Sequence, residues 1–218
     1  MRTRAFKFLS IFMMAGALFF SLSCSINLTQ PSMEVRRYQL DYEAPITGVD
    51  SMVDAVMRIR RFSASPVYDR PEIIFSSGKF ERGVDFYNQW ATRPGDMIPA
   101  LLMRDIQASG LFRAVTNNLS GLLPDYELEG VVMEFLDADK DGKERSAVLS
   151  VQVTVTKVNP GKGENAILIQ KTYAASSPFT ERKPQAFVAA MSAAMKTFSG
   201  ELIKDIQNTI RQSGKRGK

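Results

Sequence analysis

Three aspartates and a glycine between residues 137 and 142 have the spacing of a calcium-binding loop. Asp137, Asp139, Asp141 and Gly142 match the first six positions of an EF-hand loop, whose carboxylates coordinate Ca²⁺. The twelfth position, which should carry a bidentate glutamate, is Val148. An acidic hairpin turn explains the same residues, because aspartates favour turns through local hydrogen bonds. We therefore predict no metal site and leave cation binding by these aspartates open.

Histidine is absent from all 218 residues, which removes several classes of catalysis. Without an imidazole there is no Ser-His-Asp or Cys-His arrangement, and the most frequent zinc ligand is missing. Paired carboxylates of the glycosidase type remain conceivable, but no spacing in the sequence singles out a pair. We predict a protein without catalytic residues or a cofactor, with a carboxylate-based hydrolase as the less favoured alternative.

The first 23 residues have the pattern of a bacterial export signal. Three basic residues precede a charge-free apolar run from Phe8 to Phe20. This run is shorter than the stretch of about 20 residues that a membrane-spanning helix needs. The only cysteine of the chain, Cys24, follows directly.

Cys24 is the candidate site of lipidation. Ser21-Leu22-Ser23-Cys24 resembles a bacterial lipobox, although its leucine stands two residues before the cysteine and the usual position is three before it. A cysteine at the cleavage point is consumed by acylation, for example with palmitate, whereas a lone thiol in an exported domain has no disulfide partner. The acyl chains would anchor the protein without a membrane-spanning segment. Ser25 follows, and in bacterial lipoproteins a serine there, in contrast to aspartate, implies transfer to the outer membrane.

The charge of the mature chain gives no support for a nucleic-acid partner. The signal holds three of the 28 basic residues and none of the 23 acidic ones, so the net charge falls from +5 to +2 on cleavage. We predict that residues 213–218 form a disordered basic tail.

A helix is predicted after Pro94 and Gly95. Asp96 has the residue type of an N-cap, and Gly110 supplies a left-handed stop. Apolar residues recur between these ends at helical spacing. The predicted buried stripe consists of Ile98, Leu101, Leu102 and Ile106, and the predicted water-facing residues are Arg104, Asp105 and Gln107.

Two aromatic residues, Tyr87 and Trp90, precede this helix. They have the types of a stacking platform for a ligand, but a large aromatic residue between a strand and a helix is more often part of the core. We favour the core, so no ligand-binding residue is identified from the sequence.

The remaining pattern predicts an α+β fold. A curved, mainly antiparallel sheet is packed by two amphipathic helices, including a long C-terminal helix over residues 184–211. In the middle of the predicted sheet, Val151, Val153 and Val155 face one way and the polar residues between them the other. Predicted strands span residues 35–42, 56–62, 72–77, 79–87, 112–116, 126–135, 147–158 and 166–175, of which the last three form an antiparallel meander.

Motifs in the same regions resemble the bacterial ABC-type transport auxiliary lipoproteins, which include the paraquat-inducible lipoprotein C group. The resemblance covers most of the chain after residue 35. It rests on Arg37-Tyr38-Gln39-Leu40, Val56 to Phe62, Glu72-Ile73-Ile74-Phe75, Tyr87, Trp90-Ala91, Pro94 and Ser109 to Phe112.

This resemblance implies an accessory subunit of an intermembrane lipid or phospholipid transport system of the mammalian-cell-entry type. The lipoprotein would face the periplasm from the inner leaflet of the outer membrane and dock a periplasmic tunnel protein. The resemblance leaves open whether the lipoprotein forms a homo-oligomer. A lipoprotein binding module of another envelope-assembly machine is the alternative. The expected organisation is a signal peptide (1–23), a lipidated N-terminus and tether (24–34), a single α+β periplasmic domain (35–212) and the tail (213–218).

Overall fold

The computed structural model describes residues 34–49, 51–140, 144–161 and 166–216. The predicted signal peptide, Cys24, the predicted tether up to residue 33 and Asp141 lie outside these residues. The chain divides after Glu34, and the residues from Val35 onward form one compact unit.

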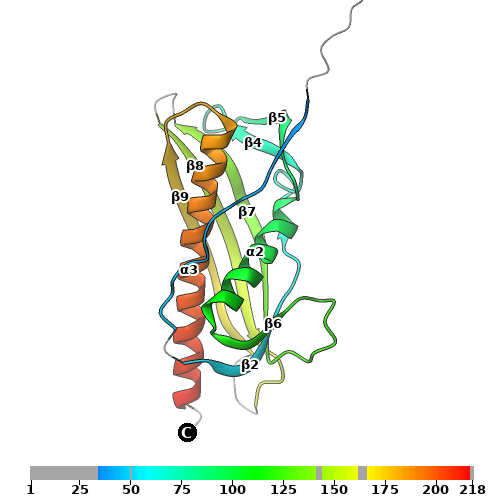
Figure 1. Ribbon diagram of the computed structural model, residues 1–218, viewed down its shortest axis with the longest axis vertical. Helices are drawn as coiled ribbons and strands as arrows, with labels where there is room; N and C mark the ends of the chain where they lie inside the picture. Colours follow the sequence, from blue (N-terminus) through cyan, green and yellow to red (C-terminus); the bar gives the residue numbers. More distant parts are fainter. Residues whose placement is uncertain (1–33, 50, 141–143, 162–165, 217–218) are drawn as a thin grey trace, which may run out of the picture. The chain divides into compact units, whose positions relative to one another are not determined.

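The strands of the described residues form one open, nine-stranded mixed sheet (Figure 1). Together with the two helices this confirms the predicted α+β class. The strands are β1 (Arg36–Tyr38), β2 (Val53–Ile59), β3 (Ser63–Ala64), β4 (Glu72–Ser76), β5 (Arg82–Trp90), β6 (Phe112–Thr116), β7 (Tyr126–Lys140), β8 (Glu144–Lys157) and β9 (Ile167–Phe179).

Strand β7 organises the sheet. One of its edges pairs with β8 along its whole length, and β8 pairs with β9, which confirms the predicted antiparallel meander. Its other edge takes β2, β3 and β4 in succession, all parallel to it. The sequence pattern did not reveal these parallel pairings, because strands of two to seven residues carry no signal for a distant partner.

Two helices lie on the same face of the sheet (Figure 1). Helix α2 (Pro94–Ser109) contacts β6 and β7, and α3 (Pro184–Arg216) packs on β8 and β9. Gly110 ends α2 in the left-handed conformation, as predicted, at φ 68°. Helix α3 continues five residues past its predicted end at Arg211 and includes residues 213–216 of the expected tail.

The start of α2 differs from the prediction. The N-cap residue is Arg93, without a capping side chain, and Asp96 lies inside the first turn. The Asp96 carboxylate instead accepts two bonds from Arg61, one of them 3.1 Å from Nη2 to Oδ2. Gly95 lets this turn approach closely, since a Cβ there would lie 2.8 Å from the carbonyl oxygen of Phe62.

The core lies between the helices and the sheet. On β8, Val151, Val153 and Val155 are buried, and the residues between them are partly or fully exposed, as predicted. One apolar side of α3 also faces the core, as expected for an amphipathic helix. Its buried members are Phe187, Met191, Met195, Phe198, Leu202 and Ile206.

One predicted surface residue of α2 is buried. Asp105 is 0% exposed, because the extended segment between β1 and β2 crosses between α2 and α3 (Figure 1). The hydroxyl of Tyr42, in this segment, donates to Asp105 Oδ2 at 2.7 Å. The adjacent amide of Asp41 donates to Ser192 Oγ on α3 at 3.1 Å. The prediction that Asp105 faces water was therefore wrong.

Candidate partner-binding surface

Two of the aspartates with EF-hand spacing, Asp137 and Asp139, lie in strand β7 near its end at Lys140, and Asp141 is outside the described residues. Asp137 is buried and pairs with Arg145, whose Nε lies 3.2 Å from Oδ1 and whose Nη2 contacts Oδ2. Burial raises the pKa of Asp137, and the hydrogen bonds from Arg145 act in the opposite direction. Within the described residues no three Asp, Glu or Cys side chains are grouped so that they could hold a metal ion.

A cavity of about 140 Å³ beside this pair contains the acidic residues Asp85 and Asp137. Both carboxylates are engaged in structural contacts, since Asp85 Oδ1 accepts the backbone amides of Tyr87 and Asn88, each at 3.0 Å. Such engagement does not favour the acid and nucleophile roles of a carboxylate hydrolase.

Trp90 and Tyr87 do not form a joint platform. Trp90 is the last residue of β5 and is 2% exposed, with its ring centroid 5.0 Å from that of Phe135 and 5.7 Å from that of Phe187. Tyr87 is 45% exposed. The prediction of a place in the core is confirmed for Trp90 and wrong for Tyr87.

Three exposed leucines lie on the loop between β6 and β7, residues 117–124. Leu119 and Leu123 are 92% and 87% exposed, and Leu122 is also exposed. Hydrogen bonds within the loop fix its path, because Asn117 Oδ1 accepts the Leu119 amide at 3.0 Å and Ser120 Oγ accepts the Leu122 amide at 3.2 Å. We call residues 117–124 the leucine loop.

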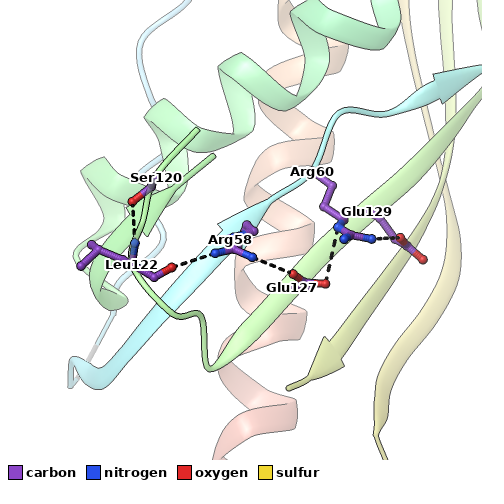
Figure 2. Close-up of polar contacts among 6 residues, drawn as sticks. All are labelled: Arg58, Arg60, Ser120, Leu122, Glu127 and Glu129. Atoms are coloured by element: carbon purple, nitrogen blue, oxygen red, sulfur yellow. Dashed lines mark hydrogen bonds and ion pairs between the residues drawn. The ribbon is translucent and has the colours of Figure 1, made fainter. Parts of the chain in front are cut away.

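A ladder of charged residues ties the leucine loop to the sheet (Figure 2). Arg58 on β2 donates from Nη2 to the carbonyl oxygen of Leu122 at 2.7 Å, and its Nη1 lies 3.4 Å from Glu127 Oε1. Arg60 continues the ladder, with 3.5 Å from its Nε to Glu127 and 3.8 Å from its Nη1 to Glu129. The two arginines reach glutamates on β7 because β2 pairs with β7 in parallel, which the sequence pattern does not reveal.

An open groove of about 380 Å³ runs between the leucine loop and α2. Its lining combines apolar and polar residues. The apolar ones are Ile59, Pro99, Ala100, Met103 and Leu119, and the polar ones are Arg60, Arg61, Asp96, Asn117 and Asn118. A groove of this kind beside exposed leucines is typical of a surface that receives a partner.

The sequence pattern does not reveal this surface. Residues 117–124 have the composition of a polar loop, and the three leucines among them are the signal that could have indicated it. In the described part of the chain, no helix has both the length and the apolar character that a membrane crossing requires.

The fold is an α+β domain with two helices on one face of a mixed sheet. The chain belongs to the family of ABC-type transport auxiliary lipoprotein components, which matches residues 38–202. The resemblance noted in the sequence is thereby confirmed. A search of curated proteins found no match.

Solved structures show the same fold. A protein from Xanthomonas campestris superposes with a TM-score of 0.72 at 19% identity, and the match covers 83% of this chain and 99% of that one. An uncharacterised protein gives a TM-score of 0.61 at 11% identity, over 79% of this chain and 99% of the other.

Proposed function

We propose that this protein is a non-enzymatic accessory subunit of an ABC-type intermembrane lipid transport system, anchored by acyl chains on Cys24. The observation that carries the proposal is the family match over residues 38–202, which names an auxiliary lipoprotein component of ABC-type transport. The anchor would hold the domain at the inner leaflet of the outer membrane, where it docks a periplasmic tunnel subunit of the mammalian-cell-entry type.

The leucine loop and its groove are the proposed docking surface. Leu119 and Leu123 would enter an apolar pocket of the partner, because exposed leucines lose an unfavourable contact with water on burial. The polar residues that line the groove would surround this contact between the leucines and the partner and exclude water from it. The Arg58–Glu127 ladder holds the loop in one conformation, which lowers the entropy cost of docking.

One experiment tests the anchor and the partner together. Cells of the native host are grown with labelled palmitate, the protein is solubilised with detergent and captured, and co-purified proteins are identified. We expect a labelled protein that begins at Cys24 and carries a tunnel subunit with it. An unlabelled protein free of membranes would refute the anchor, and a labelled protein that never carries a tunnel subunit would refute the docking role.

A matched pair of variants tests the docking surface. Leu119→Ser should reduce co-purification of the tunnel subunit about tenfold, the effect of losing a well-buried leucine at an interface. Ile46→Ser changes a side chain that is equally exposed, at 99%, in the segment between β1 and β2. Equal recovery with both variants would place the docking surface elsewhere. If Leu119→Ser instead lost partners that are not transport components, the result would favour an envelope-assembly machine.

A further inference from the structure

Strand β5 carries a rigid protrusion beside the first strand of the domain. Between the neighbouring β4 residues Glu72 and Ile73, the paired position on β5 moves from Gln89 to Asp85. Residues 86–88 therefore project from the ladder with β4 as a bulge. Such bulges commonly re-aim side chains at the edges of sheets.

The bulge is fixed by side chains on both sides of it. Asp85 Oδ1 accepts the amides of Tyr87 and Asn88, and Asp85 Oδ2 accepts from Asn88 Nδ2 at 2.7 Å. Gln89 Nε2 donates to the carbonyl oxygen of Phe86 at 3.1 Å. Asn88 Oδ1 also accepts from the Tyr38 hydroxyl at 3.1 Å, which ties the bulge to β1.

This rigid bulge presents aromatic side chains to solvent. Phe86 is 66% exposed and Tyr87 is 45% exposed. At the other end of β5, the turn from β4 presents Phe80, which is 88% exposed. The guanidinium of Arg82 shapes this turn by donating to the carbonyl oxygen of Glu81 at 2.9 Å. Folding leaves these three rings in water, and apolar groups exposed together at a surface are typical of a contact with a protein or a membrane.

The same edge holds basic residues and the first described residues of the chain. Arg36 and Arg37 are exposed on β1 and lie opposite Asn88 and Gln89 in a parallel pairing. Exposed Lys79 and Arg82 flank the turn, together with one exposed acid, Glu81. Figure 1 shows β4, β5 and the start of the described chain at the same end of the domain. The leucine loop follows β6, the opposite end of the strand path.

We infer that the β5 bulge and the β4–β5 turn contact the headgroup region of the bilayer to which the protein is anchored. The inference rests on the proposed anchor at Cys24. From Cys24 to Val35 the chain spans at most roughly 40 Å when fully extended, so this edge stays within reach of the bilayer. Aromatic rings settle at the boundary of headgroups and acyl chains, and nearby arginines and lysines bind lipid phosphates.

This second contact has a mechanical consequence. Acyl chains alone leave a domain free to rotate on its tether, and a peripheral patch restricts that rotation. Because the bulge and the leucine loop belong to opposite ends of the strand path, contact of the bulge with the bilayer would direct the leucine loop toward the periplasm.

The test uses the acylated full-length protein in phosphatidylethanolamine vesicles with added phosphatidylglycerol. Phe86→Cys and Leu119→Cys variants are each labelled with an environment-sensitive fluorophore, which an acylated Cys24 does not take up. Lipids with a nitroxide on the upper acyl chain then quench fluorophores at the headgroup boundary. We expect quenching at position 86 to exceed that at position 119 about twofold or more.

Three outcomes would overturn the inference, and flotation of the protein with the vesicles separates the first two from failure of the anchor. Equal quenching at the two positions, with the protein floating with the vesicles, refutes the bilayer contact alone. A concentration-dependent spectral shift at position 86 without vesicles would show a second protein copy on the bulge, which also refutes it. A protein that does not float with the vesicles refutes the anchor and this inference together. Both substituted side chains are exposed, and unchanged thermal midpoints would verify that both variants fold.

Discussion

The hydroxyl of Tyr42 lies 2.7 Å from Oδ2 of Asp105, a carboxylate that is completely buried between two helices and an extended segment. Arg104 Nε reaches Oδ1 of the same carboxylate at 2.9 Å, and its guanidinium stacks 4.4 Å from the centroid of the Tyr42 ring. Burial and the neighbouring Asp105 both raise the pKa of Tyr42, so its proton stays on the hydroxyl and remains available for this bond. The contact fastens the segment between β1 and β2 to α2.

Removing that hydroxyl should destabilise the domain. Tyr42→Phe leaves the buried carboxylate of Asp105 with one donor fewer, which costs about 1–3 kcal/mol of unfolding free energy. Urea denaturation measures the loss. Tyr87→Phe is the matched control, because that side chain is exposed, and it should change the free energy by less than about 0.5 kcal/mol. Equal effects of the two variants would show that the Tyr42 hydroxyl contributes nothing specific.

Replacing Gly130 should also destabilise the domain. A Cβ at this position would lie 2.7 Å from Cε2 of Phe62 and 2.8 Å from the carbonyl oxygen of Gln152, and the backbone oxygen cannot move away cheaply. Gly130→Ala should cost about 1–3 kcal/mol by overpacking. Gly121→Ala, where nothing lies within 4 Å, serves as the control and should be nearly neutral. Thermal melts of both proteins distinguish the cases, and an unchanged midpoint for Gly130→Ala would contradict the packing described.

Arg58 should control the order of the leucine loop. Arg58→Ala removes the bond to the carbonyl oxygen of Leu122. We expect amide hydrogen exchange in residues 119–123 to accelerate roughly tenfold, the equivalent of about one hydrogen bond. Arg60→Ala removes the contacts to Glu127 and Glu129 and leaves the bond to the loop, so it is the matched control. Mass spectrometry of exchanged peptides measures both, and similar protection of the loop in both variants would argue against this role of Arg58.

Asp205 should make stability depend on pH. Its partial burial raises its pKa, but hydrogen bonds from Lys171 and Tyr173, each at 2.8 Å, outweigh burial and lower the pKa below its ordinary value. The folded state therefore holds this proton less tightly than the unfolded state. The resulting stabilisation is present above the unfolded pKa near 4 and disappears as the pH falls through the lower folded pKa.

Asp205→Asn tests this sign. The variant should lose at most about 1 kcal/mol at pH 7, since the pair with Lys171 is largely exposed, and should match the wild type in acid. Denaturation at a series of pH values measures the difference. Asp54→Asn, in the more exposed pair with Arg113, should show almost no difference at either pH. A deficit of Asp205→Asn that grew toward low pH would contradict the assignment.

The sequence alone determined the elements with strong local patterns. The alternation of β8, the apolar stripe of α3 and the glycine stop after α2 each require only neighbours along the chain, and all three are present. Strand β6 has the predicted bounds because Gly110 and a polar loop enclose its short apolar run. The family resemblance also lay in such local motifs, which a linear pattern preserves.

Only the tertiary structure decided what covers each element. Asp105 occupies a polar helix position, yet Tyr42 reaches it from more than 60 residues away. The parallel strands on one edge of β7, the groove beside the leucine loop and the tie between Tyr38 and the β5 bulge arise in the same way. Local periodicity reports which face of an element is apolar, because it depends on the geometry of a single helix or strand. It carries no information about which distant segment lies on that face, since that choice is made by packing across the whole domain.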